Sequence, residues 1–319
     1  MSNIQLSKFI VTTTIYSPTE ATKRFCAMDG WQVIVVGDLK TPHDEYQALN
    51  CIYLHPEEQE KKYPELSAAI GWCNIQRRNI GFVEAYHRGA DVIATVDDDN
   101  IPYDDWGTDL YVGKEVDADL YETTQDIFDP LSITQNNHLW HRGFPLDYLA
   151  GKNDVTSSGL TKRRVLIQAD LWDGDPDVDA IARLTHRPEV KYDEITRPYC
   201  SNRVSPFNSQ NTFLAREVIP YYVVFPHVGR MDDIWGSYFL QILFPSALIY
   251  NRASVYQDRN EQDLITNLEN EILGYRQTLP LVQNWLKGLP KESPLPIGIP
   301  EKAMQFFHAY RDCFPDTSL

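Results

Sequence analysis

Three adjacent aspartates are the residues of this sequence with the clearest chemical potential. Asp97, Asp98 and Asp99 directly follow the apolar run 92–96. Carboxylates this close together repel each other and raise each other's pKa unless a positive charge lies between them. No lysine lies nearby in the sequence, and hard divalent cations prefer carboxylate oxygens. We therefore expect Asp97 and Asp99 to bind Mn²⁺ or Mg²⁺, although an acidic turn exposed to solvent is the structural alternative.

A second acidic pair, Asp232 and Asp233, lies in GRMDDIWGSYFLQILF, just before an apolar stretch that predicts a helix. Acidic side chains favour a helix N-terminus, where they cap N–H groups and interact with the helix dipole, so a structural role would explain them. A carboxylate in a cleft that excludes water is also suited to general-base catalysis. Both aspartates are therefore candidate catalytic residues.

Three arginines are candidates for balancing this negative charge. Arg77 and Arg78 are neighbours in a predicted helix, where adjacent side chains point about 100° apart, so at most one of them faces the acidic strand end. That guanidinium would pair with a carboxylate or with a substrate phosphate. Arg142 lies in HRGFP, where the following glycine would let the backbone and a ligand approach closely. Arg142 is thus a candidate anion-binding residue, or a structural arginine in a tight turn.

The elements that must position these residues alternate between strand and helix over the first hundred residues. The first predicted helix follows Ser17, a candidate N-cap before Pro18, and a longer one covers 66–90. This order favours an α/β fold with a mainly parallel sheet flanked by helices. Ligands of such sheets lie beyond the carboxyl ends of the strands, where Asp38 and the three aspartates are found. The predicted strands cover 8–16, 31–38, 51–56 and 91–99.

The C-terminal part of the chain has a different pattern. An amphipathic helical stretch, interrupted at Pro280, is followed by a proline-rich link and one more helix. We expect a catalytic domain over residues 1–258 and a helical C-terminal annex over 259–319. The annex would pack on the domain or on a second subunit, giving a homo-oligomer.

Composition excludes several classes of protein. The chain has 319 residues, a formal net charge of -16 and a pI of about 4.9, which argues against binding to nucleic acid or to an anionic membrane. The five widely spaced cysteines indicate reduced thiols rather than a disulfide framework, and His138 and His141 have no partners for zinc. No apolar run approaches the roughly 18 residues of a membrane helix. The N-terminus lacks the pattern of a signal peptide, so we expect a cytoplasmic protein.

The sequence lacks a GxGxxG loop after the first strand and has no GxxxxGK[ST] loop, so a phosphate-bearing ligand would need another device, such as a divalent cation. The segment QRRNIGFVEAYHRGADVIATVDDDNIP resembles the central stretch of nucleotide-sugar-dependent glycosyltransferases of the GT-A fold. The triplet, the segment 127–149 and GRMDDIWGSYFLQ are most similar to the reversibly glycosylated polypeptides (UDP-arabinopyranose mutases) and the related STELLO-type proteins. The resemblance covers roughly residues 8 to 255 and departs after Arg142 and at the C-terminus.

The resemblance implies a metal-dependent glycosyltransferase with a nucleotide-diphosphate sugar donor, expected to be a UDP-sugar, and a sugar or glycan acceptor. It implies that Asp233, the last acid before the helix, is the general base. It favours Arg77 over Arg78 in the site. The threonines of the implied nucleotide pocket have a structural alternative, because threonine is common in strands. Asp38 has one as well, because it could simply form an Asx turn. The residues implied to line this pocket are Thr12, Thr13, Thr14, Asp38, Arg77, Arg78, Asp97 and Asp98.

Two other functions stay open from the sequence. In the mutases the arginine that matches Arg142 accepts the sugar covalently, but a protonated arginine is a poor nucleophile, so we expect an electrostatic role here. A non-catalytic sugar-nucleotide binding protein is the other alternative. His227 and Asp258 are candidates for a third metal ligand. The loop 197–217 would form the acceptor side of the cleft, with amides from Asn208, Gln210 and Asn211.

Overall fold

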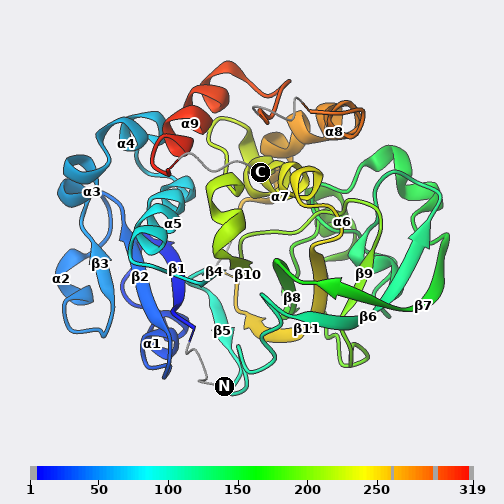
Figure 1. Cartoon of the computed structure of the whole chain (residues 1–319), viewed down its shortest axis with the longest axis horizontal. Coiled ribbons are helices and arrows are strands. Elements are labelled where there is room, and N and C mark those ends of the chain that lie inside the picture. The colour runs from blue at the N-terminus through cyan, green and yellow to red at the C-terminus, as the bar shows by residue number, and fades with distance from the viewer. Residues whose placement is uncertain (1–5, 260–261, 290–293, 316–319) are drawn as a thin grey trace.

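The computed structural model describes residues 6–259, 262–289 and 294–315. Four parallel strands form the first part of its sheet, with β1 in the middle next to β2 and β4, and β3 beyond β2 (Figure 1). Their apolar side chains are buried on both faces, as is typical of parallel strands. This part confirms the predicted strands to within a few residues. The strands are β1 (Lys8–Thr14), β2 (Gln32–Gly37), β3 (Ile52–Leu54) and β4 (Val92–Val96).

The rest of the sheet is mixed, whereas the sequence predicted a mainly parallel one. Strand β10 (Asn211–Ala215) runs antiparallel to β4 and to β8 (Ile167–Gly174), and β8 is parallel to β11 (Leu248–Gln257). The described strands form one 11-stranded sheet in the order β3-β2-β1-β4-β10-β8-β11-β9-β6-β7, with β5 beside β11. Parallel neighbours need long crossovers, usually helical, and the alternation of strand and helix stops after β4.

Two helices of the N-terminal part differ from the prediction. The predicted helix 66–90 is split into α4 (Pro64–Ile70), a turn with positive φ at Gly71 and Cys73, the short η1 (Ile75–Arg77) and α5 (Arg78–His87). The turn is held by Asp38, whose carboxylate accepts hydrogen bonds from the backbone N–H groups of Cys73 and Asn74. This contact joins residues 35 positions apart, so the local pattern did not reveal it.

Helix α1 (Glu20–Cys26) begins later than predicted, because Thr19 and not Ser17 is its N-cap. The Thr19 hydroxyl accepts a hydrogen bond from the N–H of Thr22 at 3.1 Å. It also donates to the carbonyl of Asp98, which ties the helix start to the acidic strand end.

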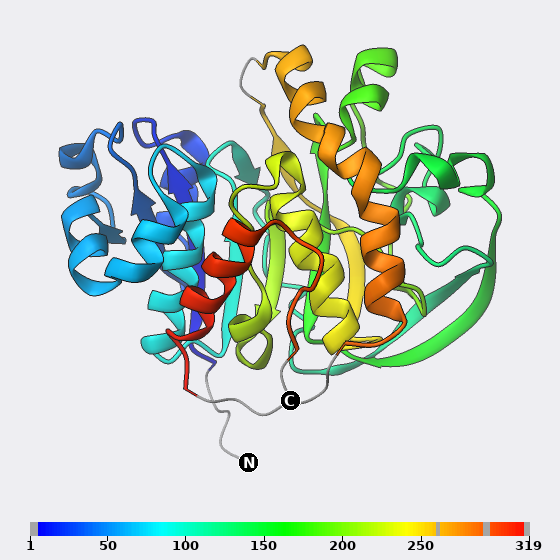
Figure 2. The same ribbon diagram turned by 90° about the horizontal axis from the view of Figure 1, so that it is seen from above.

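Three C-terminal helices lie across one face of the sheet (Figure 2). These are α7 (Asp232–Leu243), α8 (Leu264–Leu286) and α9 (Glu301–Arg311). Helix α8 continues through Pro280, which corrects the predicted interruption; Pro280 is exposed, so the carbonyl that loses its helical partner can face water. Helix α8 packs against α6 (Ala180–His186) and α7, and α9 packs against α4. Aromatic contacts such as Phe239 with Trp285 and Phe307 make these helices part of the main core.

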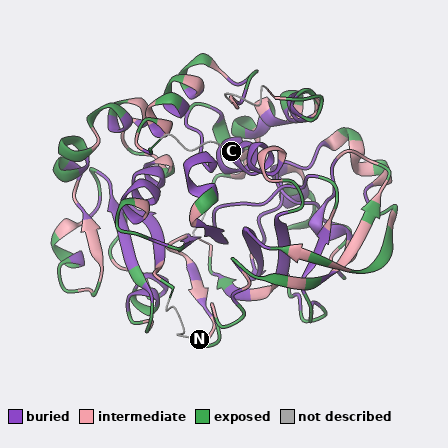
Figure 3. Cartoon of the chain, in the orientation of Figure 1, coloured by how far each residue is buried: buried purple, intermediate pink, exposed green. Residues whose placement is uncertain are grey.

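Burial is concentrated in the central strands and in α5 and α7, while in the antiparallel pair of β6 and β7 most of β6 is half-buried and most of β7 is exposed (Figure 3). The cysteines of the described residues are all free thiols. In the described ranges we find no helix with the length and apolar character needed to cross a membrane. The domain division, the cytoplasmic location and the homo-oligomer stay predictions.

The other elements are α2 (His43–Tyr46), α3 (Pro56–Lys62), β5 (Asn100–Pro102), β6 (Glu115–Thr123), η2 (Pro130–Ile133), η3 (Leu146–Gly151), β7 (Val155–Arg164), β9 (Tyr199–Ser201), η4 (Arg216–Tyr221) and η5 (Gly229–Met231).

Candidate functional site

An acidic cleft of about 410 Å³ lies beyond the carboxyl end of β4 and beside the N-terminus of α7. Its volume is within the range of small-molecule sites. The cleft brings together the acidic pair of α7, two members of the aspartate triplet and Arg142, which are far apart in sequence. It is lined by Ile75, Gln76, Asp97, Asp99, Arg142, Asp177, Ser209, Gln210, Gly229, Arg230, Asp232, Asp233, Gln257, Arg259, Gln262 and Asn270.

The aspartate triplet divides between two environments. Asp97 and Asp99 line the cleft, whereas the carboxylate of Asp98 accepts a hydrogen bond from the hydroxyl of Thr14. Asp97 accepts from Gln210 Nε2 at 2.9 Å and forms an ion pair with Arg78. The two outer carboxylates are therefore available to one ligand in the cleft.

Asp99 is held by the last residue of β11. Strand β5 pairs antiparallel with β11 so that Asn100 lies opposite Gln257. Gln257 Nε2 consequently donates to Asp99 Oδ1 at 2.9 Å. Burial, followed by the charge of Asp97, raises the pKa of Asp99 to about 7, although Arg259 opposes this rise. The triplet thus has less positive charge around it than its negative charge requires.

The positive charge beside Asp97 is Arg78, which corrects the preference for Arg77. Arg78 is fully buried and also donates to the carbonyl of Ser209. Arg77 points instead to Gln59 Oε1 at 2.9 Å and Ser67 Oγ at 3.0 Å. The break between η1 and α5 sets the two side chains apart, so Arg77 has a structural role.

Arg142 lies at the centre of a buried ion cluster. Its Nε and Nη2 donate to the carboxylate of Asp177 at 2.8–3.0 Å, its Nη2 lies 2.9 Å from Asp233 Oδ1, and its Nη1 donates to the carbonyl of Arg230. Burial disfavours the charge, but Asp177 and Asp233 outweigh it and raise the pKa of Arg142 well above its usual value. The guanidinium is therefore charged, with its nitrogens committed to protein acceptors.

The glycine of HRGFP serves this cluster rather than a ligand. Gly143 has a φ of 81°, and a Cβ at this position would lie 2.2 Å from Ile234 Cγ2. The turn can therefore pack directly against α7, which places Arg142 beside the two acids at the start of that helix.

The two acids of α7 have different surroundings. Asp233 accepts from the N–H of Ser209 at 2.8 Å and its hydroxyl at 3.0 Å, in addition to the ion pair with Arg142. Asp232 accepts from Gln76 Nε2 at 2.8 Å, and Arg142 Nη1 is 3.6 Å away. Burial, followed by the charge of Asp233, raises the pKa of Asp232 to about 7. This geometry favours Asp232 as a proton acceptor, whereas the resemblance favoured Asp233.

Of the residues implied for the nucleotide pocket, Asp97 lines the cleft, whereas the three threonines and Asp38 lie at the ends of β1 and β2 and do not line it. Thr13 donates to the carbonyl of Val36 at 2.9 Å, and Thr14 donates to Asp98. The hydroxyl of Thr12 is buried without a partner among the described residues, and Asp38 is buried against the turn after α4. Their contact with a nucleotide stays a prediction.

The predicted acceptor amides mostly hold other protein groups. Asn208 Nδ2 donates to Asp177 Oδ2 at 3.0 Å, and Gln210 holds Asp97. Asn211 is in the core, where it accepts from the indole of Trp106 at 2.9 Å. The candidate third ligands, His227 and Asp258, are exposed and are not among the residues that line the cleft.

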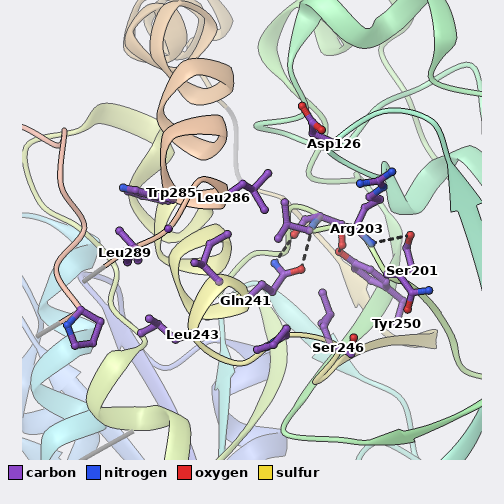
Figure 4. A pocket seen from close by; sticks show the side chains of 18 residues that line it. Asp126, Ser201, Arg203, Gln241, Leu243, Ser246, Tyr250, Trp285, Leu286 and Leu289 are labelled. Atoms are coloured by element: carbon purple, nitrogen blue, oxygen red, sulfur yellow. Dashed lines mark hydrogen bonds between the residues drawn. The ribbon is translucent and has the colours of Figure 1, made fainter. Parts of the chain in front are cut away.

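A second cavity, of about 580 Å³, lies at the opposite ends of α7 and α8 (Figure 4). Its walls include Leu243, Trp285 and Leu286, and its polar groups pair with one another: Gln241 Nε2 donates to the carbonyl of Ser205 at 2.6 Å. The described residues that line this cavity include no cluster of acids and arginines like that of the cleft. The acidic cleft is therefore the candidate active site.

Several residues of the cleft escaped the sequence analysis. Asp177 follows β8 in the acidic turn GDPDVDA, which is a visible but weak signal. Arg230 precedes the acidic pair of α7, and its Nε donates to Glu271 of α8 at 2.8 Å. Arg259 and Gln257 come from the end of β11. Only their position in the fold marks these residues as part of the site.

No family model matches this chain. The chain is 24% identical over 302 residues to "Probable glycosyltransferase STELLO1" and 23% identical to "Probable glycosyltransferase STELLO2", both of Arabidopsis thaliana. These matches cover 84% of the chain but only 38% and 39% of the relatives. Glucosyl-3-phosphoglycerate synthase from Mycobacterium tuberculosis, in a crystal structure with phosphoglyceric acid, matches with 11% identity and a TM-score of 0.44 over 90% of this chain and 82% of that one. The similarity to STELLO-type proteins is thus confirmed, while the link to the mutases stays a prediction.

Proposed function

We propose that this protein is a glycosyltransferase that transfers a sugar from a nucleotide-diphosphate donor, expected to be a UDP-sugar, to an acceptor hydroxyl. The observation that carries the proposal is the convergence of Asp97 and Asp99 with Asp232 in one cleft. Paired carboxylates suit a cation bound to a diphosphate, and a separate carboxylate suits general-base catalysis. The names of the two Arabidopsis relatives agree with this reaction class.

The cleft provides the donor atoms that Mn²⁺ or Mg²⁺ prefers. Asp97 and Asp99 are two carboxylates facing the same space, and Gln257 Oε1 is buried beside Asp99 with no hydrogen-bond donor among the described residues. Hard cations bind such oxygens and complete their coordination with water and substrate phosphates. We therefore assign the metal to Asp97 and Asp99, with the Gln257 amide oxygen as a further ligand. When bound, the cation would stabilise the negative charge of the leaving diphosphate.

Asp232 is our candidate for the general base. In the transfer step, the acceptor oxygen forms a bond to the anomeric carbon while the bond from that carbon to the diphosphate oxygen breaks. The proton of the acceptor hydroxyl passes to the Asp232 carboxylate. Its pKa of about 7 matches neutral conditions, because an effective base must be deprotonated and still hold a proton well.

The neighbours of Asp232 keep it in position. Gln76 orients one of its oxygens, while Asp233 is occupied by Ser209 and Arg142. Arg142 is a positioning residue in this proposal. Attack on a sugar by a guanidinium nitrogen would require a neutral arginine, and the raised pKa of Arg142 disfavours that form. The geometry therefore favours transfer over mutase chemistry.

Mass spectrometry after incubation with Mn²⁺ and a panel of nucleotide sugars would test this function. We expect the sugar on an added acceptor, or on water when no acceptor is present. Asp232→Asn should prevent transfer while leaving donor binding intact. Sugar attached to the protein or converted to an isomer would support mutase chemistry instead. If the wild-type protein and the Asp232→Asn variant both bound the donor without turnover, the result would support a non-catalytic binding protein.

A further inference from the structure

We propose that Arg259 forms the anion subsite that binds the diphosphate of the donor, next to the proposed metal ligands Asp99 and Gln257. This inference rests on the proposed function and assigns a residue that the sequence motifs do not mark. It concerns the segment that follows β11, on the side of the cleft that carries Asp99.

Arg259 is a buried cation with two side-chain nitrogens that donate no hydrogen bond to the described residues. Its side chain is only 6% exposed, and it lines the cleft. Nε and Nη2 are buried and have no hydrogen-bond partner among the described residues. Buried donors without acceptors are costly and rare. The guanidinium is therefore arranged to receive acceptor atoms from a ligand.

Within the described ranges, the one ion pair of Arg259 is with an acid that has another partner. Arg259 Nε lies 3.3 Å from Asp175 Oδ2, while Asp175 Oδ1 pairs with Arg183. Arg142 and Arg230 differ, because Asp177, Asp233 and Glu271 receive their N–H groups at hydrogen-bonding distance. Of these three cleft arginines, Arg259 has the most donor capacity left for a ligand.

The position of Arg259 points to the diphosphate as the ligand. The preceding residues connect it to the acidic strand end: Gln257 Nε2 donates to Asp99 Oδ1, and the N–H of Asp258 donates to the carbonyl of Asp99 at 3.1 Å. A diphosphate that shares a cation with Asp97 and Asp99 would lie at this side of the cleft. The planar guanidinium fork matches two phosphate oxygens.

Calorimetric titration of the full chain with UDP, pyrophosphate and uridine, with and without Mn²⁺, tests the subsite. Arg259→Gln should weaken UDP and pyrophosphate binding on the order of 10- to 100-fold, the loss expected for a hydrogen bond to a charged group. Uridine binding should not change, because uridine has no phosphate. Arg259→Lys should recover part of the affinity, since it keeps the charge but not the fork.

Arg252→Gln is the matched control. Arg252 lies in β11, the strand that precedes Arg259, and pairs with Asp105 and Asp109 at 2.8 and 2.9 Å, but it does not line the cleft. The Arg252→Gln variant should bind UDP, pyrophosphate and uridine with the affinity of the wild type. A folded Arg259→Gln variant with wild-type affinity for UDP and pyrophosphate would overturn the subsite, as would an equal loss for uridine. Loss of pyrophosphate binding in a chain that transfers no sugar would retain the subsite and remove the proposed function.

Discussion

The two walls of the acidic cleft differ in how completely their charges are satisfied. The base wall, made of Arg142, Asp177, Asp232 and Asp233, is a closed network in which the arginine contacts three carboxylates. The donor wall, made of Asp97, Asp99, Gln257 and Arg259, shares one feature with the base wall, because the pKa values of Asp99 and Asp232 are both raised to about 7. It differs in its buried Gln257 Oε1 and Arg259 Nη2, which have no hydrogen-bond partner among the described residues, whereas Asp233 Oδ1 of the base wall lies 2.9 Å from Arg142 Nη2. The difference indicates that the base wall is organised before substrate arrives, whereas the donor wall is completed by its ligands.

The largest effect is expected on the donor wall. Asp97→Asn combined with Asp99→Asn should abolish UDP-sugar binding that depends on Mn²⁺, because the cation loses both carboxylates. The fold should survive with reduced stability, since the relief of repulsion between the acids is opposed by the loss of the ion pair between Asp97 and the buried Arg78. Calorimetry and a thermal melt would measure both properties. Asp98→Asn is the control for the metal dependence, which it should keep, because Asp98 faces Thr14 and does not line the cleft. Equal wild-type affinity with and without metal would contradict the proposed metal site.

The next effect concerns the base wall. Asp232→Asn should lower kcat by about 10²- to 10⁴-fold, the range for loss of a positioned general base, while donor affinity stays unchanged. Steady-state kinetics and donor titration would separate the two. Asp233→Asn is the informative neighbour, because it should also reduce stability through Arg142. If Asp232→Asn turned over normally and Asp233→Asn did not, the base would be Asp233, as the resemblance implies.

Arg142→Ala should destabilise the protein more than it changes donor affinity. Removing one partner of a buried ion cluster costs about 3–5 kcal/mol in the free energy of unfolding, because Asp177 and Asp233 would be left buried without their cation. Chemical denaturation would measure the loss. Arg142→Lys should recover part of the stability.

Radiolabelled sugar provides an independent test of Arg142. We expect no label on the denatured wild-type protein, because the guanidinium is charged and its nitrogens are engaged. A labelled peptide containing Arg142 would show that the base wall carries mutase chemistry instead.

The smallest effect is the dependence of activity on pH. Because the pKa of Asp232 is raised to about 7, kcat/KM at saturating Mn²⁺ should fall about tenfold for each pH unit below that value as the base becomes protonated. A flat profile from pH 5 to 8 would exclude Asp232 as the base. Without metal, thermal stability should decrease as pH rises from about 4 through 7, since Asp99 and Asp232 retain protons in the folded state that the unfolded chain releases. Added Mn²⁺ should oppose the part of this loss of thermal stability that arises from Asp99.

The two acids of the donor wall were visible in the sequence. An apolar run ending in three aspartates predicts a buried strand with carboxylates at its end, and both features depend on neighbours in the chain. The acids before α7 were found for the same reason. The choice between Arg77 and Arg78 could not be made from the sequence, because it depends on a turn held by Asp38, which lies at the end of another strand.

By itself, the sequence determined the parallel strands of the first half, the acidic strand end, the acids at the start of α7 and the similarity to STELLO-type proteins. Only the tertiary structure decided which charges are free. Arg142 meets Asp177 across 35 residues and Asp233 across 91, and Gln257 meets Asp99 across 158. The antiparallel strands that help to bring these side chains into contact pair over long distances in the chain. Local periodicity cannot predict such pairings, because it reports which face of an element is buried but not which element covers it.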